Sequence, residues 1–438
     1  MNSRWMSVLF LLFSGFAQAD DRLQQLLEGT ATTPALSGLQ ISLMEAGKPT
    51  DAIALGFAQR TVSGVEPLRV DHKVRIASIS KLVVALGVMR LVERNQLSLD
   101  ADVYNYLGWR LRNPQFPEQP ITLRSLLAHT SSIRDADRYF IGAGEGSIRD
   151  FFDPESAVWS EGAHWSSDPQ EVTGQYFKYS NLNFGVIAEV IERVTKQRFD
   201  QFMRDEVLAP LGISADFDTC NIPSEQRAAA FRKRDAEDNW NADGPWYAQV
   251  DGATPNCFYG MDALGEPEGY LSQYQPGANA TLFSPQGGLR ASANDLVVIL
   301  RVLANRGEYG GKRFLKPSSV ADMLAPVWTL DQELGNGMSA GEAEPGSAVD
   351  GLMTSYGLSV HRIDMRGWGF DKGPKLLLGH LGEAYGVLSH ALIDPVSGDG
   401  IATIITGTAD DPANFPGHSP LYRVEEAVVQ WWIDRQAE

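Results

Sequence analysis

The chain has 438 residues and a formal net charge of −18, with 55 acidic side chains against 37 Lys and Arg. A surface this acidic repels phosphate backbones and anionic headgroups, so neither nucleic acid nor a membrane surface is an expected partner. Hydrophobic residues make up 43% of the chain, which is enough for a large core, and the length allows two or three domains.

The first segment, MNSRWMSVLFLLFSGFAQAD, has the pattern of a secretory signal peptide. It combines a positive Arg4, a short apolar stretch from Val8 to Phe16, and the small-residue ending Ala17-Gln18-Ala19. We therefore expect cleavage after Ala19 and a periplasmic or secreted protein. The apolar stretch is too short to span a bilayer, so no membrane insertion is expected once the peptide is removed.

Short apolar segments separated by turns occupy both ends of the chain. Residues 38–60 predict two strands around a Gly-Lys-Pro turn. Further strands of the same short apolar type are predicted at 355–363, 375–382, 385–395 and 400–408. The last three segments are spaced like an antiparallel meander. An amphipathic helix is predicted at the end, over 421–436.

Helical periodicity dominates the middle of the chain, at 82–95, 122–128, 182–196 and 292–306. Strands at both ends around helices predict an α/β (α+β) fold, with one antiparallel sheet built from both chain ends and flanked by helices. The expected parts are a signal peptide over 1–19, an α/β domain over 20–75 and 290–438, and a mainly helical inserted domain over 76–289. The long stretches 134–175 and 213–285 are expected to border a functional cleft.

The stretch VRIASISKLVVALGVMRLVERNQL, residues 74–97, places Ser78 and Lys81 at the head of an apolar segment. Leu82, Leu86 and Met89 repeat at helical spacing, which predicts an amphipathic helix. Ser78 is then either a helix cap, with Lys81 extending out of the apolar face, or a nucleophile with Lys81 as its base. Residues three apart share one helical face, so the tetrapeptide leaves both interpretations open.

Two further motifs follow in chain order. Tyr179-Ser180-Asn181 stands immediately before a predicted helix, and His380-Leu381-Gly382 ends a predicted strand. Taken alone, the first is typical of a turn with a helix cap, and the second of a strand histidine satisfied by its neighbours.

Together, in this order, the three motifs resemble those of the serine hydrolases of the class C β-lactamase and D,D-peptidase type, including their esterase and D-aminopeptidase relatives. The phrases LLAHTSSI (126–133) and SPQGGLRASANDL (284–296) support the resemblance, which covers roughly residues 36–435. It implies a β-lactamase/transpeptidase-like fold and a serine hydrolase that works through an acyl-enzyme without a cofactor.

The resemblance also implies catalytic roles. Ser78 would be the nucleophile, and Lys81, desolvated in the cleft, its base. Tyr179 would be a second proton shuttle and would need cationic neighbours, which Lys81 and His380 could supply. Asn181 would hold the acyl side chain of the substrate.

An oxyanion hole is expected between two backbone N–H groups. Ser78 supplies the first at a helix N-terminus, and the resemblance implies Glu383 as the second. Gly382 would let the substrate lie close to the strand. Leu381 stands where the family usually has Thr or Ser, whose hydroxyl helps to bind a substrate carboxylate. This departure weakens the case for an efficient penicillinase and favours esters or atypical substrates.

The sequence supports no metal site and leaves the cysteines open. The seven histidines are scattered, and no local metal-binding motif occurs. An oxidising compartment would permit one disulfide between Cys220 and Cys257, and spacing alone leaves open whether the two are neighbours.

The favoured function is an exported serine hydrolase of β-lactams or related amides that acts through Ser78. The alternatives are a carboxylesterase or D-aminopeptidase of the same fold, and a penicillin-binding sensor that is acylated without turnover. In each case the partner is a small molecule: a β-lactam, a D-amino-acid peptide or an ester. The sequence does not rank these substrates.

Overall fold

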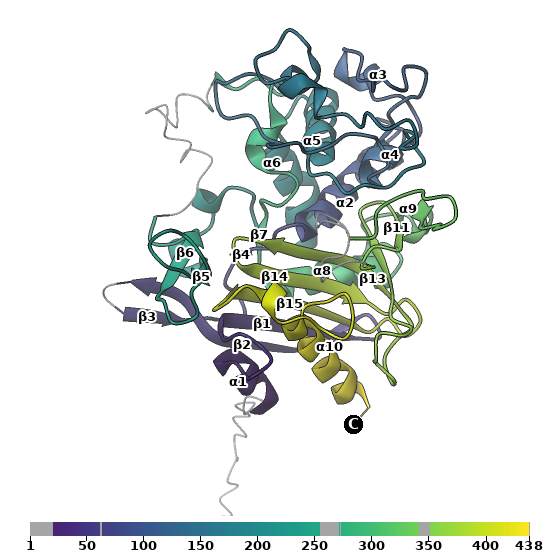
Figure 1. Cartoon of the computed structure of the whole chain (residues 1–438). Helices are drawn as coiled ribbons and strands as arrows, with labels where there is room; N and C mark the ends of the chain where they lie inside the picture. The colour runs from purple at the N-terminus through teal and green to yellow at the C-terminus, as the bar shows by residue number, and fades with distance from the viewer. Residues whose placement is uncertain (1–20, 62–63, 255–270, 272, 341–350, 438) are drawn as a thin grey trace, which may run out of the picture.

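The computed structural model describes residues 21–61, 64–254, 271, 273–340 and 351–437 (Figure 1). The predicted signal peptide, residues 1–19, and Cys257 lie outside the described residues. No helix in the described part of the chain is long and apolar enough to cross a membrane.

One large sheet is built from both ends of the chain, as predicted. Its strand order is β10-β11-β12-β13-β14-β15-β1-β2-β3, and neighbouring strands in this path are antiparallel. The strands are β1 (Leu36–Glu45), β2 (Lys48–Thr61), β3 (Gly64–Pro67), β10 (Trp328–Thr329), β11 (Ser355–Tyr356), β12 (His361–Asp364), β13 (Leu376–Ala384), β14 (Val387–Ile393) and β15 (Gly400–Thr408). Residues 355–363 form two strands rather than one, because Gly357 N donates to Val360 O in a turn between them.

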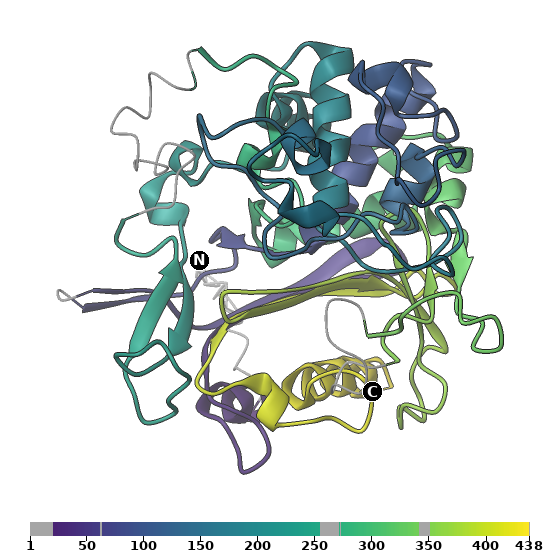
Figure 2. The same cartoon turned by 45° about the horizontal axis from the view of Figure 1, so that its top comes forward.

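Helices cover both faces of the sheet (Figure 2). On one face, α1 (Asp21–Glu28) and α10 (Arg423–Gln436) close an apolar cluster that includes Leu23, Leu377 and Trp431. On the other face, α8 (Ala293–Ala304) packs on β1, β14 and β15, and α2 (Ile79–Glu93) contacts β13 and β14. The sheet therefore forms the middle layer of the molecule, and α2 packs directly on it.

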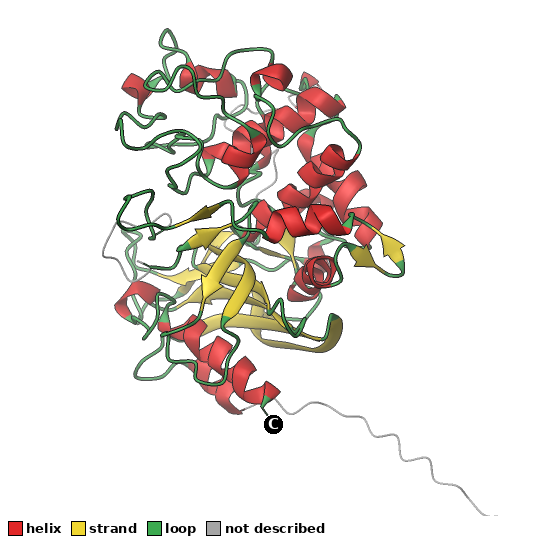
Figure 3. Cartoon of the chain, turned by 90° about the vertical axis from the view of Figure 1, so that its right-hand side faces the viewer, coloured by secondary structure: helices red, strands yellow, loops and turns green. Residues whose placement is uncertain are grey.

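The helical half is inserted between β3 and α8, and it appears as the helix-rich upper part of Figure 3. The elements of this insert and its borders are β4 (Val74–Arg75), α2, α3 (Tyr104–Leu107), α4 (Leu123–Leu127), η1 (Ile148–Phe152), η2 (Ser160–Gly162), α5 (Leu182–Thr195), α6 (Phe199–Met203), η3 (Arg204–Leu208), η4 (Ala209–Leu211), η5 (Thr219–Asn221), η6 (Ser224–Gln226), β5 (Ala230–Lys233), β6 (Trp246–Val250), η9 (Ala280–Phe283) and β7 (Arg290–Ala291). The chain enters and leaves this half side by side, because β4 pairs antiparallel with β7.

The insert also contributes strands, which the sequence analysis did not predict. β5 pairs parallel with the end of β15 and antiparallel with β6, so residues from the stretch 213–285 extend the main sheet. The remaining elements follow α8: β8 (Glu308–Tyr309), β9 (Lys312–Arg313), α9 (Pro317–Leu324) and η10 (Pro412–Asn414).

The helix after Ser78 differs from its prediction in two ways. It begins at Ile79 rather than at residue 82, and it is buried on all sides from Ile79 to Met89 instead of being amphipathic. The reason is its central position, since sheet strands pack on one side and α9 and η3 on others. Lys81 is 0% exposed, so the interpretation of a lysine extending into solvent is wrong.

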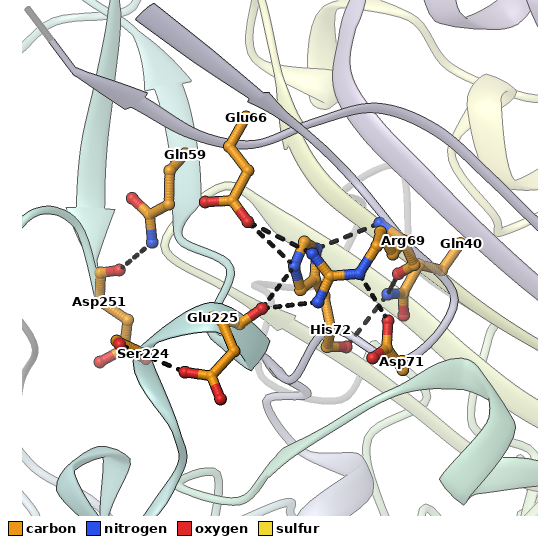
Figure 4. Close-up of polar contacts among 9 residues, drawn as sticks. All are labelled: Gln40, Gln59, Glu66, Arg69, Asp71, His72, Ser224, Glu225 and Asp251. Carbon is orange, nitrogen blue, oxygen red and sulfur yellow. Dashed lines mark hydrogen bonds and ion pairs between the residues drawn. The ribbon is translucent and has the colours of Figure 1, made fainter. Parts of the chain in front are cut away.

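Polar side chains fix the loop that leads into β4 and the site (Figure 4). The His72 ring accepts a hydrogen bond from Arg69 N at Nδ1 (3.1 Å) and donates from Nε2 to Glu225 O (3.1 Å). The side-chain amide of Gln40 donates to the backbone oxygens of Arg69 (2.6 Å) and His72 (3.0 Å). Because His72 is buried beside the Arg69 guanidinium, its pKa is lowered and the ring is a neutral structural bridge.

Cys220 is disulfide-bonded in this structure. Its expected partner Cys257 lies outside the described residues.

Candidate active site

Ser78 stands at the N-terminus of α2, directly after a sharp backbone turn. Ala77 adopts the left-handed conformation with φ 47°, which costs a non-glycine residue about 1 kcal/mol. Ser80 stabilises the turn, because its Oγ donates to Ala77 O (2.7 Å) and accepts from Leu289 N (3.1 Å). The hydroxyl of Ser78 makes no capping hydrogen bond to the helix, so its side chain is not used as a helix cap.

The ammonium of Lys81 connects three parts of the site. Its Nζ lies 2.8 Å from Ser78 Oγ, 2.8 Å from Asn181 Oδ1 and 2.8 Å from Gln286 O. These acceptors come from the start of α2, the start of α5 and the segment 284–296 that resembles the family phrase. The structure therefore brings the first two sequence motifs together around one buried lysine.

Asn181 is held in place by Asp135, a residue that the sequence analysis missed. One carboxylate oxygen of Asp135 accepts from Asn181 N (2.9 Å) and Nδ2 (3.0 Å), and the other accepts from Ser180 Oγ (2.8 Å) and Leu182 N (2.8 Å). Asp135 thereby caps α5 from a distant loop and orients the amide so that Oδ1 faces Lys81. Its position two residues after the phrase LLAHTSSI was the available signal.

The Tyr179 ring lies between a histidine and the lysine. It stacks on His129 with ring centroids 4.1 Å apart and planes at 22°. Lys81 Nζ lies 4.8 Å from the centroid of the Tyr179 ring, within the range of a cation–π contact. Tyr179 is 6% exposed and borders the cavity beside Ser78, where the second proton shuttle is expected.

The expected role of His380 as a source of positive charge needs correction. Its ring is 0% exposed, with Nδ1–H donating to Leu381 O and Nε2 accepting from Tyr356 Oη (2.9 Å). Burial, followed by the neighbouring His361 and Lys81, keeps the pKa of His380 well below its usual range. A buried neutral imidazole supplies no cation to Tyr179, so Lys81 alone remains of the two cations expected.

His361 is a second residue that the sequence analysis did not select. It lies on β12 opposite Gly379, with its ring centroid 4.1 Å from that of His380, and it lines the cavity beside Ser78. Neither ring nitrogen has a hydrogen-bond partner among the described residues. Burial and the charge of Lys81 lower the pKa of His361 to about 3, so the neutral ring is available to bond to a substrate.

The close packing of β13 against the turn before α2 requires a glycine at position 382. A Cβ built on it would lie 2.7 Å from Ile76 O and 2.9 Å from Ser78 N, so β13 runs directly against the turn before α2. Close approach of the chain's own backbone is therefore a reason for glycine here in addition to the expected close approach of the substrate. The contact also brings the next residue of β13, Glu383, beside the amide of Ser78, as an oxyanion hole between these two residues requires.

Two cavities meet at Ser78. The Leu381 cavity, of about 120 Å³, is lined by Tyr179, His361, Leu381, Glu383 and Glu425, among others. The Asn181 cavity, of about 420 Å³, is lined by Asn181, Gln286 and the aromatic rings of Tyr139, Phe140 and Tyr385. Tyr139 and Phe140 belong to the long stretch 134–175, and Thr281 of the stretch 213–285 also lines the Asn181 cavity. Both stretches thus border the cleft, as expected.

The described residues offer no ready metal site. Nowhere among residues 21–61, 64–254, 271, 273–340 and 351–437 do three side chains of His, Cys, Asp or Glu come together to hold an ion. The residues around Ser78 are instead those of nucleophilic catalysis: a hydroxyl, a buried lysine, a phenol and an amide.

Comparison with known proteins places this site in context. Esterase EstB of Burkholderia gladioli is 34% identical over 173 residues, which cover 36% of this chain and 41% of the esterase. Penicillin-binding protein 4* of Bacillus subtilis is 28% identical over 162 residues, covering 37% of this chain and 33% of that protein. The aligned segments therefore span less than half the length of these curated relatives.

Solved structures agree over much more of the chain. The D-amino acid amidase of Ochrobactrum anthropi SV3 superposes with a TM-score of 0.62 at 20% identity, covering 95% of this chain and 97% of the amidase. A penicillin binding protein from Bacillus halodurans gives a TM-score of 0.56 at 18% identity, covering 90% and 95% of the two chains. At these identities the likeness concerns the fold alone. The family model described as Beta-lactamase matches residues 20–420, and the chain belongs to this family of serine hydrolases.

Proposed function

We propose that this protein is an exported serine hydrolase that forms an acyl-enzyme on Ser78. The observation that carries the proposal is the 2.8 Å contact between Lys81 Nζ and Ser78 Oγ, made by a lysine that is fully buried and also bonded to Asn181 and Gln286. A buried amine one helical turn from a hydroxyl is the arrangement that activates a serine nucleophile.

The reaction uses the residues around Ser78 in turn. Lys81, an ammonium in the resting site, first loses one proton to solvent. Ser78 Oγ then attacks the carbonyl carbon while the Ser78 proton passes to the amine of Lys81. The negative oxygen that forms is held by the backbone N–H groups of Ser78 and Glu383. The leaving group departs with a proton from Tyr179, which Lys81 replaces, and a water molecule then attacks the acyl ester and restores the Ser78 hydroxyl.

The substrate class follows from the Leu381 cavity. Its described lining contains Leu352, Met353 and Leu381 but no Lys or Arg. Leu381 is 8% exposed and presents an apolar surface where the family usually places a carboxylate-binding hydroxyl. These features favour esters and amides whose leaving group carries no carboxylate over penicillins and D-peptides with a free C-terminus. Among the functions considered, the carboxylesterase or amidase type is thus favoured over a β-lactamase.

Intact-protein mass spectrometry tests the proposal against the sensor alternative. The protein is mixed with a p-nitrophenyl ester, a penicillin and a carbapenem, and product release is followed in parallel. Ester turnover that is abolished in Ser78→Ala supports the proposal. A stable adduct on Ser78 without turnover identifies a binding protein instead, and turnover that persists in Ser78→Ala would exclude Ser78 as nucleophile.

Ser78→Ala should remove the nucleophile without unfolding the protein. Since the Ser78 hydroxyl makes no capping bond to α2, its removal forfeits none of the roughly 1 kcal/mol that a serine cap contributes. Lys81 loses one acceptor but keeps Asn181 Oδ1 and Gln286 O, so we expect the Tm to change little from that of the wild type. Export is tested separately, by sequencing the N-terminus of the mature protein, which should begin at Asp20.

A further inference from the structure

We propose that the Leu381 cavity binds a protonated amine carried by the leaving group of the substrate, with Glu383 and Glu425 as its anionic partners. This inference rests on the proposed function of Ser78 and deepens it by naming the chemical class of the substrate.

Glu425 is the central observation. It lies in the first turn of α10, is 5% exposed, and lines the Leu381 cavity. Its Oε2 accepts a hydrogen bond from Tyr422 N (3.2 Å), whereas its Oε1 accepts none from any described residue. The neighbouring Glu426 pairs with Arg423, but Glu425 forms no ion pair within the described part of the chain.

A second carboxylate faces the same space. Glu383 lines the Leu381 cavity, and the Tyr422 hydroxyl donates to its Oε2 (3.2 Å). Burial and the Glu383 carboxylate together raise the pKa of Glu425 to about 8. An uncompensated buried carboxylate is unfavourable, and proteins pair such groups with a cation or keep them protonated. A cation in the cavity would compensate the Glu425 carboxylate and would also lie near Glu383.

The surroundings restrict which cation fits. None of the described residues lining the cavity is Lys or Arg, and Leu352, Met353 and Leu381 add apolar surface to its lining. A volume of about 120 Å³ has room for a small group only. The best match is therefore an ammonium on a short aliphatic chain, with its carbons against Leu381 and its N–H toward Glu425.

The position relative to Ser78 assigns the amine to the leaving group. Asn181, expected to hold the acyl side chain, lines the other cavity. Glu383 directly follows Gly382 on β13, so its side chain starts beside the expected oxyanion hole. A leaving group that enters the Leu381 cavity thus meets Glu383 and Glu425 within a few bonds of the reacting carbon.

Three butyryl thioesters with leaving groups of similar size test the inference. The thiols are 2-(dimethylamino)ethanethiol, which is cationic, 3-methylbutanethiol, which is neutral, and 3-mercaptopropionate, which is anionic; the released thiol is measured. In the wild type, kcat/KM should be highest for the cationic ester and lowest for the anionic one. The ratio of kcat/KM for the cationic over the neutral ester should fall about tenfold or more in Glu425→Gln, since a charged hydrogen bond is lost.

Glu426→Gln is the matched control, because Glu426 lies on the same helical turn and does not line this cavity. It should keep the wild-type ratio. Glu383→Gln should lower the ratio in the same direction as Glu425→Gln. A ratio that stays constant in both cavity variants would overturn the inference.

A binding measurement separates this inference from the proposed function. In Ser78→Ala, which cannot turn substrate over, 3-methylbutylamine should raise the Tm, and 3-methylbutanol should raise it less. The added substitution Glu425→Gln should abolish the amine effect. Equal shifts with the amine and the alcohol, or none with either, would exclude the cation site, whereas failure of the proposed function would appear only as turnover without Ser78.

Discussion

Gly382 and Ser78 approach so closely that a Cβ built on Gly382 would lie 2.9 Å from the Ser78 backbone nitrogen. The same Cβ would meet Ile76 O and Ser389 Oγ, each at 2.7 Å. β13 and the turn before α2 are therefore packed backbone to backbone, and this contact sets the separation of the two expected oxyanion donors.

Gly382→Ala should reduce kcat sharply, because one of the two backbones must move. Displacing one oxyanion donor costs about 10²–10³ in rate. Gly287→Ala is the matched control, since a Cβ at Gly287 would find its nearest atom at an ordinary 3.6 Å. The measurement is kcat for a p-nitrophenyl ester together with the Tm of both variants. Full activity of Gly382→Ala would contradict an oxyanion hole at this contact.

Lys81→Met should slow acylation by about 10²–10⁴, the usual contribution of a general base. Methionine fills the space of the lysine stem but leaves Asn181 Oδ1 and Gln286 O without their donor. The burst of p-nitrophenol in stopped flow measures acylation directly.

Lys73→Met controls for the loss of a buried lysine. Lys73 is 5% exposed and paired with Asp295, so this variant should lose stability but keep acylation per folded molecule. A normal burst in Lys81→Met would show that Lys81 is not the base.

Asp135→Ala should lower both stability and activity, because the carboxylate accepts four hydrogen bonds at the start of α5. Loss of a half-buried cap of this kind costs about 1–2 kcal/mol. Freed from Asp135, Asn181 should position substrates less well, which would appear mainly in KM. Asp137→Ala, at an exposed position two residues away, should change neither quantity. If Asp135→Ala and Asp137→Ala have the same Tm and the same KM, Asp135 does not position Asn181.

Leu381→Thr should shift specificity toward substrates that carry a carboxylate. A restored hydrogen bond to a charged group is worth about ten- to a hundredfold in kcat/KM when well aligned. The measurement compares kcat/KM for one penicillin and one neutral ester in both proteins. A constant ratio would mean that Leu381 does not face the carboxylate, and the preference for leaving groups without a carboxylate would need another cause.

In His390→Leu, stability should fall less on acidification than it does in the wild type. His390 lies on β14 opposite Leu381, is buried, and has no partner for either ring nitrogen among the described residues. Burial lowers its pKa to about 4, below the value near 6.5 of the unfolded chain. The unfolded state therefore binds the extra proton first, and the stability from neutral His390 is present above pH 6.5 and lost as pH falls toward 4.

The test compares Tm at pH 7 and at pH 4.5. The wild type should lose more of its Tm between these values than His390→Leu. His418→Leu is the control, because His418 is not buried like His390 and should not alter the pH dependence. If the wild type and His390→Leu lose the same Tm between these pH values, His390 takes up its proton as readily in the folded protein as in the unfolded chain.

Much of the fold could be read from the sequence because its signals are local. Alternating apolar residues predicted the meander of β13, β14 and β15, and helical periodicity predicted α5 and α8 within a few residues of their observed bounds. Motif order also paired Ser78 and Lys81 with Tyr179 and Asn181, about a hundred residues away, through the resemblance to a known family.

The buried environment of each side chain was decided only by the tertiary structure. No local pattern indicated that α2 is enclosed on all sides, that His380 is neutral, or that Asp135 orients Asn181. Each depends on packing between segments distant along the chain, and burial controls charge because an ion loses its hydration.

The sequence by itself therefore determined the main strands and helices and the three motifs that carry the chemistry, since periodicity and motif spacing are properties of neighbouring residues. The tertiary structure decided the charges and the specificity of the site. It places Glu425 from the last helix and His361 from β12 against Ser78 near the start of the insert, and only such contacts across the fold fix which protons and which substrates the cavity holds.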